Sequence, residues 1–138
     1  MLHKFLIVVI SLSAISCNSS EPKVDQVAYN NTKENLAEKE RKSPLSFLSV
    51  GGTDRKNLLG QTVVKGVIEN KASVCSYKDM RVKMLFYKEG ELVANHEQVM
   101  EDVIKANNNL DFKAKYKTPK GTDSVALSIM SASVFEKE

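Results

Sequence analysis

The sequence of 138 residues has few of the residues that bind metals or form disulfides. It contains no tryptophan, two cysteines and two histidines. Zinc sites need three or four Cys or His ligands, but His3 lies in an N-terminal apolar segment, which leaves Cys75 and His96. Because Cys17 is expected to be modified, as argued below, Cys75 has no partner for an internal disulfide. We therefore expect no metal site, a structural role for Cys75 and a solvated surface position for His96.

Catalytic motifs are missing as well. No Walker loop, G-x-S-x-G elbow or H-E-x-x-H helix occurs. Asp123 and Ser124 are adjacent, but no histidine near them in the sequence offers the base that a catalytic triad needs. The acidic residues Glu97, Glu101 and Asp102 lack the spacing of a calcium loop, which favours a solvated edge. We predict that the protein is not an enzyme and uses no cofactor.

The N-terminal segment combines a positive charge with a short apolar run. Lys4 is followed by six large apolar residues and then by a segment of mostly Ser and Ala up to Cys17. This is the layout of a secretory signal peptide, and the run is too short to span a bilayer, which takes roughly 20 apolar residues. The tetrad Ala14-Ile15-Ser16-Cys17 resembles a lipobox, the motif at which bacterial lipoproteins are acylated on cysteine and cleaved before it. We predict a signal peptide over residues 1–16 and a lipid anchor on Cys17.

Export and lipidation define an expected location. Two or three acyl chains on Cys17 are enough to hold a protein stably on a membrane. Asn18 follows the cysteine, in place of the aspartate that retains lipoproteins of enteric-type bacteria at the inner membrane. We expect anchoring in the cell envelope, and in the outer rather than the inner membrane of a cell that has two.

Residues 18–43 are polar and charged and offer few groups for a hydrophobic core. Such a segment cannot bury enough apolar surface to offset its loss of conformational entropy. We expect residues 17–43 to be a flexible tether and residues 44–138 to fold without it. Good helix formers near Asn31 and Glu34 leave a short helix as an alternative for part of the segment.

From residue 44 onward, apolar and polar residues alternate. Met80, Val82, Met84 and Phe86 share one face of residues 80–86, and residues 110–116 alternate in the same way. Period two predicts strands with one buried face. Further strands are expected at residues 45–50, 61–70, 92–100 and 124–132, with turns at Gly51-Gly52, Glu89-Gly90, Asn107-Asn108-Asn109 and residues 118–121. Short strands with regular turns and little helix indicate an antiparallel sandwich.

Three of these segments carry a family pattern. They read VKGVIEN at residues 64–70, YKDMRVKMLFYKEG at residues 77–90 and LDFK at residues 110–113. Their order resembles the FxLYD-type domain of bacterial envelope lipoproteins, over residues 62–132. The resemblance implies an immunoglobulin-like antiparallel β-sandwich of six to seven strands, with no catalytic residues and a binding or structural role.

Lys113, Lys115 and Lys117 alternate along one predicted strand and should point the same way. They form either a stripe for an anionic partner or a set of outward lysines that discourages edge-to-edge strand pairing, which we favour. Arg81 and Lys83 would extend the stripe if their strand were adjacent. A formal net charge of +3, without a ladder of aromatic residues beside the lysines, does not suggest a nucleic acid partner.

The expected role is that of a non-catalytic interaction or structural module, attached to the membrane through lipid on Cys17 and in contact with another envelope protein. The alternative is a periplasmic or surface lipoprotein that binds an ion, a glycan or a small molecule. A pull-down from membranes and a thermal-shift screen with small ligands distinguish the two.

We predict that Cys17→Ser abolishes acylation, because the thiol is the group that accepts the lipid. Fatty-acid labelling followed by membrane fractionation should show this variant unlabelled and released from the membrane. Cys75→Ser is the matched control and should be labelled like the wild type. Continued labelling of the Cys17 variant would contradict the lipoprotein interpretation.

Overall fold

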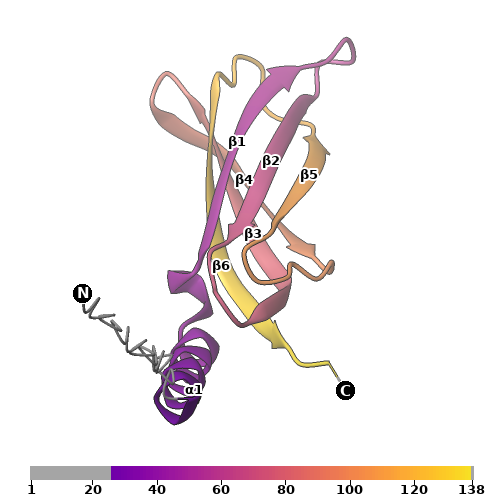
Figure 1. Cartoon of the computed structure of the whole chain (residues 1–138). Helices are drawn as coiled ribbons and strands as arrows, with labels where there is room; N and C mark the ends of the chain where they lie inside the picture. Colours follow the sequence, from indigo (N-terminus) through magenta and orange to yellow (C-terminus); the bar gives the residue numbers. More distant parts are fainter. Residues whose placement is uncertain (1–25, 138) are drawn as a thin grey trace, which may run out of the picture.

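The computed structural model describes residues 26–137, which form one α-helix and six strands (Figure 1). The expected signal peptide and the expected lipid anchor at Cys17 lie outside the described residues. The elements are α1 (Gln26–Lys42), the short 3-10 helix η1 (Pro44–Ser46), β1 (Leu48–Lys56), β2 (Thr62–Asn70), β3 (Ser76–Lys88), β4 (Glu91–Met100), β5 (Asn109–Tyr116) and β6 (Ser124–Phe135).

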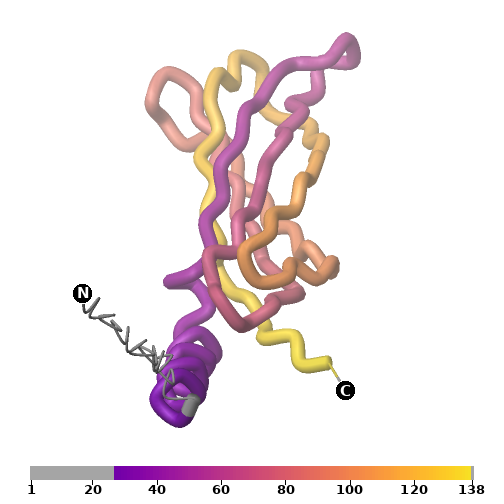
Figure 2. Tube along the Cα trace, viewed as in Figure 1, coloured from indigo at the N-terminus to yellow at the C-terminus, as the bar shows by residue number. Residues whose placement is uncertain are grey.

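The strands form two three-stranded sheets that pack face to face. Their orders are β1-β2-β5 and β4-β3-β6, and every strand pairing is antiparallel. The edge strands β1 and β6, which belong to different sheets, contact each other, and Figure 2 shows them following the same side of the molecule. The predicted all-β antiparallel sandwich is therefore confirmed, with six strands.

The core is organised around β3, the central strand of its sheet. Met80, Val82, Met84 and Phe86 are fully buried, as their alternation predicted. They form one cluster with apolar residues of the facing sheet, including Val64 and Ile68 of β2 and Ala114 of β5. The period-two pattern therefore identified the buried face of the central strand correctly.

β1 differs from the short strand expected at residues 45–50, because it continues through the Gly51-Gly52 pair that the sequence suggested as a turn. Gly52 lies opposite Gly66 in the β1–β2 pairing. A Cβ atom on Gly52 would lie 2.9 Å from the side chain of Leu127 in β6. The missing side chain therefore allows the two sheets to approach closely at this point.

The polar segment expected to be a flexible tether is, from Gln26 onward, the helix α1, which lies beneath one end of the sandwich (Figure 1). Of the side chains described in α1, only Ala37 and Glu40 are buried. They are three positions apart and so share one face of the helix. Pro44, which cannot continue the backbone hydrogen-bond pattern, follows the last turn. The last turn of α1 is thus part of the folded unit, and the boundary expected at residue 44 lies too late.

A buried carboxylate attaches α1 to the sandwich. Glu40 is 1% exposed, and its two carboxylate oxygens accept hydrogen bonds from the backbone N–H groups of Ser73, Val74 and Cys75 at 2.7, 2.9 and 2.8 Å. Burial acts to raise the pKa of Glu40, but the hydrogen bonds from these three N–H groups outweigh it, so the pKa lies below its ordinary value. The carboxylate therefore remains ionised in the interior and is the hydrogen-bond acceptor for three successive N–H groups of the β2–β3 loop.

The first residues of β3 support the same contact. The hydroxyl of Tyr77 donates to the backbone carbonyl oxygen of Glu40 at 2.9 Å. Tyr77 and Met80 are both fully buried although they are three positions apart in a strand. The register of β3 against β6 shifts between them, where Asp79 has a φ of 51°. This bulge turns Tyr77 inward and places its hydroxyl at the end of α1.

We predict that Glu40→Gln lowers the free energy of unfolding by about 2 kcal/mol or more, because it removes a charged acceptor and turns an amide donor towards backbone donors. The stabilisation by Glu40 should be complete above the ordinary glutamate pKa of about 4.3. It should be lost as the pH falls from there through the lowered native pKa, since only the ionised form is favoured by the fold. Denaturant titrations of both proteins at neutral and acid pH measure this, and the variant should lack that part of the acid dependence.

Glu38→Gln is the matched control. Glu38 lies in the same helix and forms an exposed ion pair with Lys42, so its replacement should leave the free energy of unfolding nearly unchanged. A chain that begins at Pro44 should be less stable than the chain that contains α1, because it leaves the three N–H groups without their acceptor. Equal stability of the two chains would show that α1 is only a tether.

Candidate functional site

The three lysines of the predicted stripe lie together on the outer face of the β1-β2-β5 sheet. Lys113 and Lys115 belong to β5, Lys117 follows it, and all three are exposed. The register places Lys65 of β2 opposite Lys113 and brings Arg55 of β1 into the row of Lys115. Within residues 26–137 none of these side chains has an ion pair. We refer to this set as the basic face: Arg55, Lys65, Lys113, Lys115 and Lys117.

Lys65 changes the interpretation of the stripe. Outward lysines protect an edge strand against pairing with another chain, which suffices for β5. β2, however, lies between β1 and β5 and has no free edge. Like charges directly opposite each other, as at Lys65 and Lys113, also destabilise a sheet. Edge protection therefore does not account for Lys65.

Arg81 and Lys83 do not extend the basic face. Both belong to β3, which lies in the other sheet. The Arg81 guanidinium instead forms an ion pair with Glu97 of the neighbouring strand β4, with 3.4 Å between Nη1 and Oε2. Alternation along a strand showed which way these side chains point, but it carried no information on which strands are neighbours.

A shallow pocket of about 520 Å³ opens on the β1-β2-β5 sheet, next to the basic face. It lies over the backbone of Gly52 and Gly66, on the face opposite to the one where the ring of Phe112 packs on Gly66. Its charged groups come from Lys65, Asp111 and Lys113, and the rest of its lining is Thr53 and Val67. The arrangement suits a small ligand with an anionic group and an apolar part.

His96 is not the solvated surface residue that the sequence predicted. The register places it opposite Met84 on the inner face of β4, and its ring stacks on Tyr116 of β5 with 4.2 Å between the centroids. Phe86 contacts both rings edge-on, at 5.8 and 5.9 Å. The Tyr116 hydroxyl donates to Oε1 of Gln98 at 2.9 Å, and burial raises the pKa of Tyr116. The cluster packs β4 against β5 across the two sheets.

The remaining candidate ligands are scattered. Among the described residues no three His, Cys, Asp or Glu side chains come together in a group that would hold a metal ion. Glu97, Glu101 and Asp102 are exposed, which agrees with a solvated edge. Cys75 is buried, its thiol donates to the Ala37 carbonyl oxygen at 3.6 Å, and burial followed by the charge of Glu40 raises its pKa. A thiol that stays protonated and buried is unreactive.

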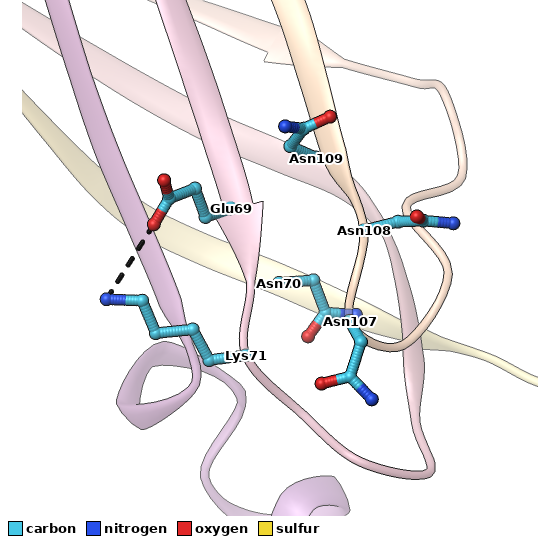
Figure 3. Close-up of a pocket in the computed structure, with 6 residues that line it drawn as sticks. All are labelled: Glu69, Asn70, Lys71, Asn107, Asn108 and Asn109. Carbon is cyan, nitrogen blue, oxygen red and sulfur yellow. Dashed lines mark ion pairs between the residues drawn. The ribbon is translucent and has the colours of Figure 1, made fainter.

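A polar pocket of about 360 Å³ lies at the end of the sandwich near α1 (Figure 3). Glu69 and Lys71 form an ion pair at its rim, with 3.7 Å between the charged atoms. Asn70 is buried and its amide is fully used: Nδ2 donates to the carbonyl oxygens of Cys75, Ile104 and Lys105, and Oδ1 accepts from the N–H of Ala72. Asn70 therefore joins two loops and is not available to a ligand.

Comparison of the chain with family models, with curated proteins and with solved structures finds no match. Within residues 26–137 no helix has both the length and the apolar character needed to cross a membrane.

The Gly66–Phe112 contact beneath the pocket leads to a stability prediction. A Cβ atom on Gly66 would lie 2.3 Å from Cζ of Phe112, so Gly66→Ala should force the ring to move and cost about 1–3 kcal/mol. Gly51→Ala is the control in the neighbouring strand, because nothing lies within 4 Å of the added atom, and its effect should stay within about 0.5 kcal/mol. Denaturant titration compares the two, and equal effects would mean that the ring does not cover Gly66.

Proposed function

We propose that the protein is an exported lipoprotein, acylated at Cys17, whose sandwich is a non-catalytic interaction module of the cell envelope. In this proposal the partner is another envelope protein with an acidic surface, and it binds the basic face. The lipobox-like segment supports the anchor, and Asn18 favours the outer membrane. The FxLYD-like pattern supports a binding or structural role.

One observation carries the choice of surface: Lys65 lies on a central strand opposite Lys113, and neither has an ion pair within residues 26–137. Strands in a sheet are about 4.8 Å apart and alternate residues of a strand about 7 Å. Five cations at this spacing create a local positive potential, although the whole chain has a formal net charge of only +3. An acidic partner relieves the repulsion between them, which gives binding a direct electrostatic driving force.

The pocket over the backbone of Gly52 and Gly66 favours the second candidate function, a lipoprotein that captures a small molecule or glycan. Lys65 and Lys113 would hold an anionic group there, and the side chain of Val67 would contact the apolar part of the ligand. The two functions use the same surface but differ in what stabilises the isolated protein. In the second function, a small ligand raises its unfolding temperature in a dose-dependent way. In the first function, only the protein partner does so.

The test replaces Lys65, Lys113 and Lys115 with Gln and compares the variant with wild type in pull-downs from solubilised membranes. The acidic partner should be retained by wild type, lost from the triple variant and released as salt rises, because the Debye length shrinks from about 10 Å at 0.1 M to about 3 Å at 1 M. The control, Lys78→Gln with Lys83→Gln and Lys105→Gln, removes the same charge elsewhere and should retain the partner. Equal retention by both variants would refute the basic face as the binding site.

A further inference from the structure

A second surface lies at the other end of the sandwich, where the β1–β2 hairpin protrudes (Figure 1). Its turn contains Leu58 and Leu59, whose exposed fractions of 106% and 84% make them the most exposed large apolar residues among those described. Turns are normally built from Gly, Pro, Asn, Asp and Ser, whose backbone conformations and short polar side chains suit a turn. The side chains of these two leucines bury little apolar surface against the rest of the fold.

The turn holds both leucines outward. Oδ1 of Asn57 accepts hydrogen bonds from the N–H groups of Leu59 and Gln61 at 3.0 and 2.9 Å, and Nδ2 donates to Oε1 of Gln61 at 2.9 Å. Gly60 closes the turn with a φ of 73°, a conformation that glycine adopts without strain. The backbone of the tip is therefore held by its own hydrogen bonds, with both leucine side chains exposed to solvent.

Lysines surround this apolar tip. Lys56, Lys117 and Lys120 line a depression of about 730 Å³ together with Leu59, and the side chain of Lys88 lies against Gly121 at its rim. Nζ of Lys56 donates to Oγ1 of Thr62 and of Thr118 at 2.6 and 2.7 Å. Lys88, Lys117 and Lys120 have no ion pair within the described part of the chain and are the cations left for a ligand. The nearby carboxylate of Asp123 is directed elsewhere, since it accepts a hydrogen bond from the N–H of Glu89 at 2.8 Å.

We propose that this tip is a membrane-docking site that inserts Leu58 and Leu59 into the surface of a bilayer containing anionic lipids. The surrounding lysines would contact the lipid phosphates. A convex apolar tip needs a partner that yields around it, and a bilayer offers a deformable apolar layer directly beneath negative charge. This charge complementarity, with the projecting leucines, favours a lipid surface over an acidic protein. The inference concerns the hairpin tip, which shares only Lys117 with the basic face, and it does not depend on the proposed function.

The experiment measures binding to lipid vesicles by co-sedimentation. It uses residues 17–138 with Cys17→Ser, so that neither the signal segment nor an acyl chain brings the protein to the lipid; the whole described fold is retained. The protein should bind mixed vesicles of phosphatidylglycerol and phosphatidylcholine but not pure phosphatidylcholine. Leu58→Ser and Leu59→Ser should each weaken binding about tenfold. Leu45→Ser, an exposed leucine at the opposite end of the fold, is the control and should bind normally.

Insertion has its own readout because the chain contains no tryptophan. Leu58→Trp supplies a single fluorophore, whose emission should shift to the blue with anionic vesicles and stay unchanged with neutral ones. Lys117→Gln and Lys120→Gln should each weaken binding about fivefold, whereas Lys105→Gln and Lys137→Gln, far from the tip, should not.

Three results would overturn the inference. If the serine variants bind anionic vesicles like wild type, or if the tryptophan shows no shift on binding, then lysines of the sandwich attract the lipid without insertion of the tip. If the wild type binds no vesicles even at low salt, the tip does not dock on lipid, and an apolar pocket on a protein is its remaining partner.

Discussion

The attachment of α1 to the sandwich depends on a single buried carboxylate. Glu40 accepts three backbone hydrogen bonds from the β2–β3 loop, while its own carbonyl oxygen accepts the hydroxyl of Tyr77. Buried charge is tolerated only when it is fully hydrogen-bonded, and here the loop that satisfies it is itself held by Asn70. The helix, the loop and the start of the central strand consequently form one unit, and the direction in which the chain leaves towards its N-terminus is set by the fold.

The sandwich separates two kinds of surface. The outer face of the β1-β2-β5 sheet carries cations in neighbouring rows, which suits an extended acidic partner. The β1–β2 hairpin is convex and apolar, with lysines around it, which suits an interface between water and lipid. Lys117 belongs to both surfaces, since it continues the β5 row and also lines the depression beneath Leu59. The two proposed contacts therefore differ in shape but share one lysine.

Sequence alternation predicted the elements whose form is decided locally, and it failed where distant residues decide. The alternation in residues 80–86 predicted their buried face correctly, because period two is a property of the strand alone. Gly52 lies within β1 and not in a turn. A side chain is missing there because Leu127 of a distant strand occupies the space beside it. Glu40 resembles any solvated glutamate in a charged segment, and no local pattern marks its burial. The lysines of β5 were identified as a candidate site, but Lys65 was not included. The sequences of β2 and β5 do not show that these two strands are neighbours in the sheet.

The Tyr116–His96 stack joins the two sheets on the side of the sandwich formed by β4 and β5. Along β1 and β6 the two sheets are in close backbone proximity, whereas β4 and β5 are edge strands held together by side chains such as this stack and the Tyr116–Gln98 hydrogen bond. Separation on the β4–β5 side breaks side-chain contacts only and leaves every strand pairing intact, so it requires less free energy than global unfolding. Water and small apolar solutes should therefore enter the core from that side, where an oxidant would reach the buried Met100 of β4 and then the methionines of β3.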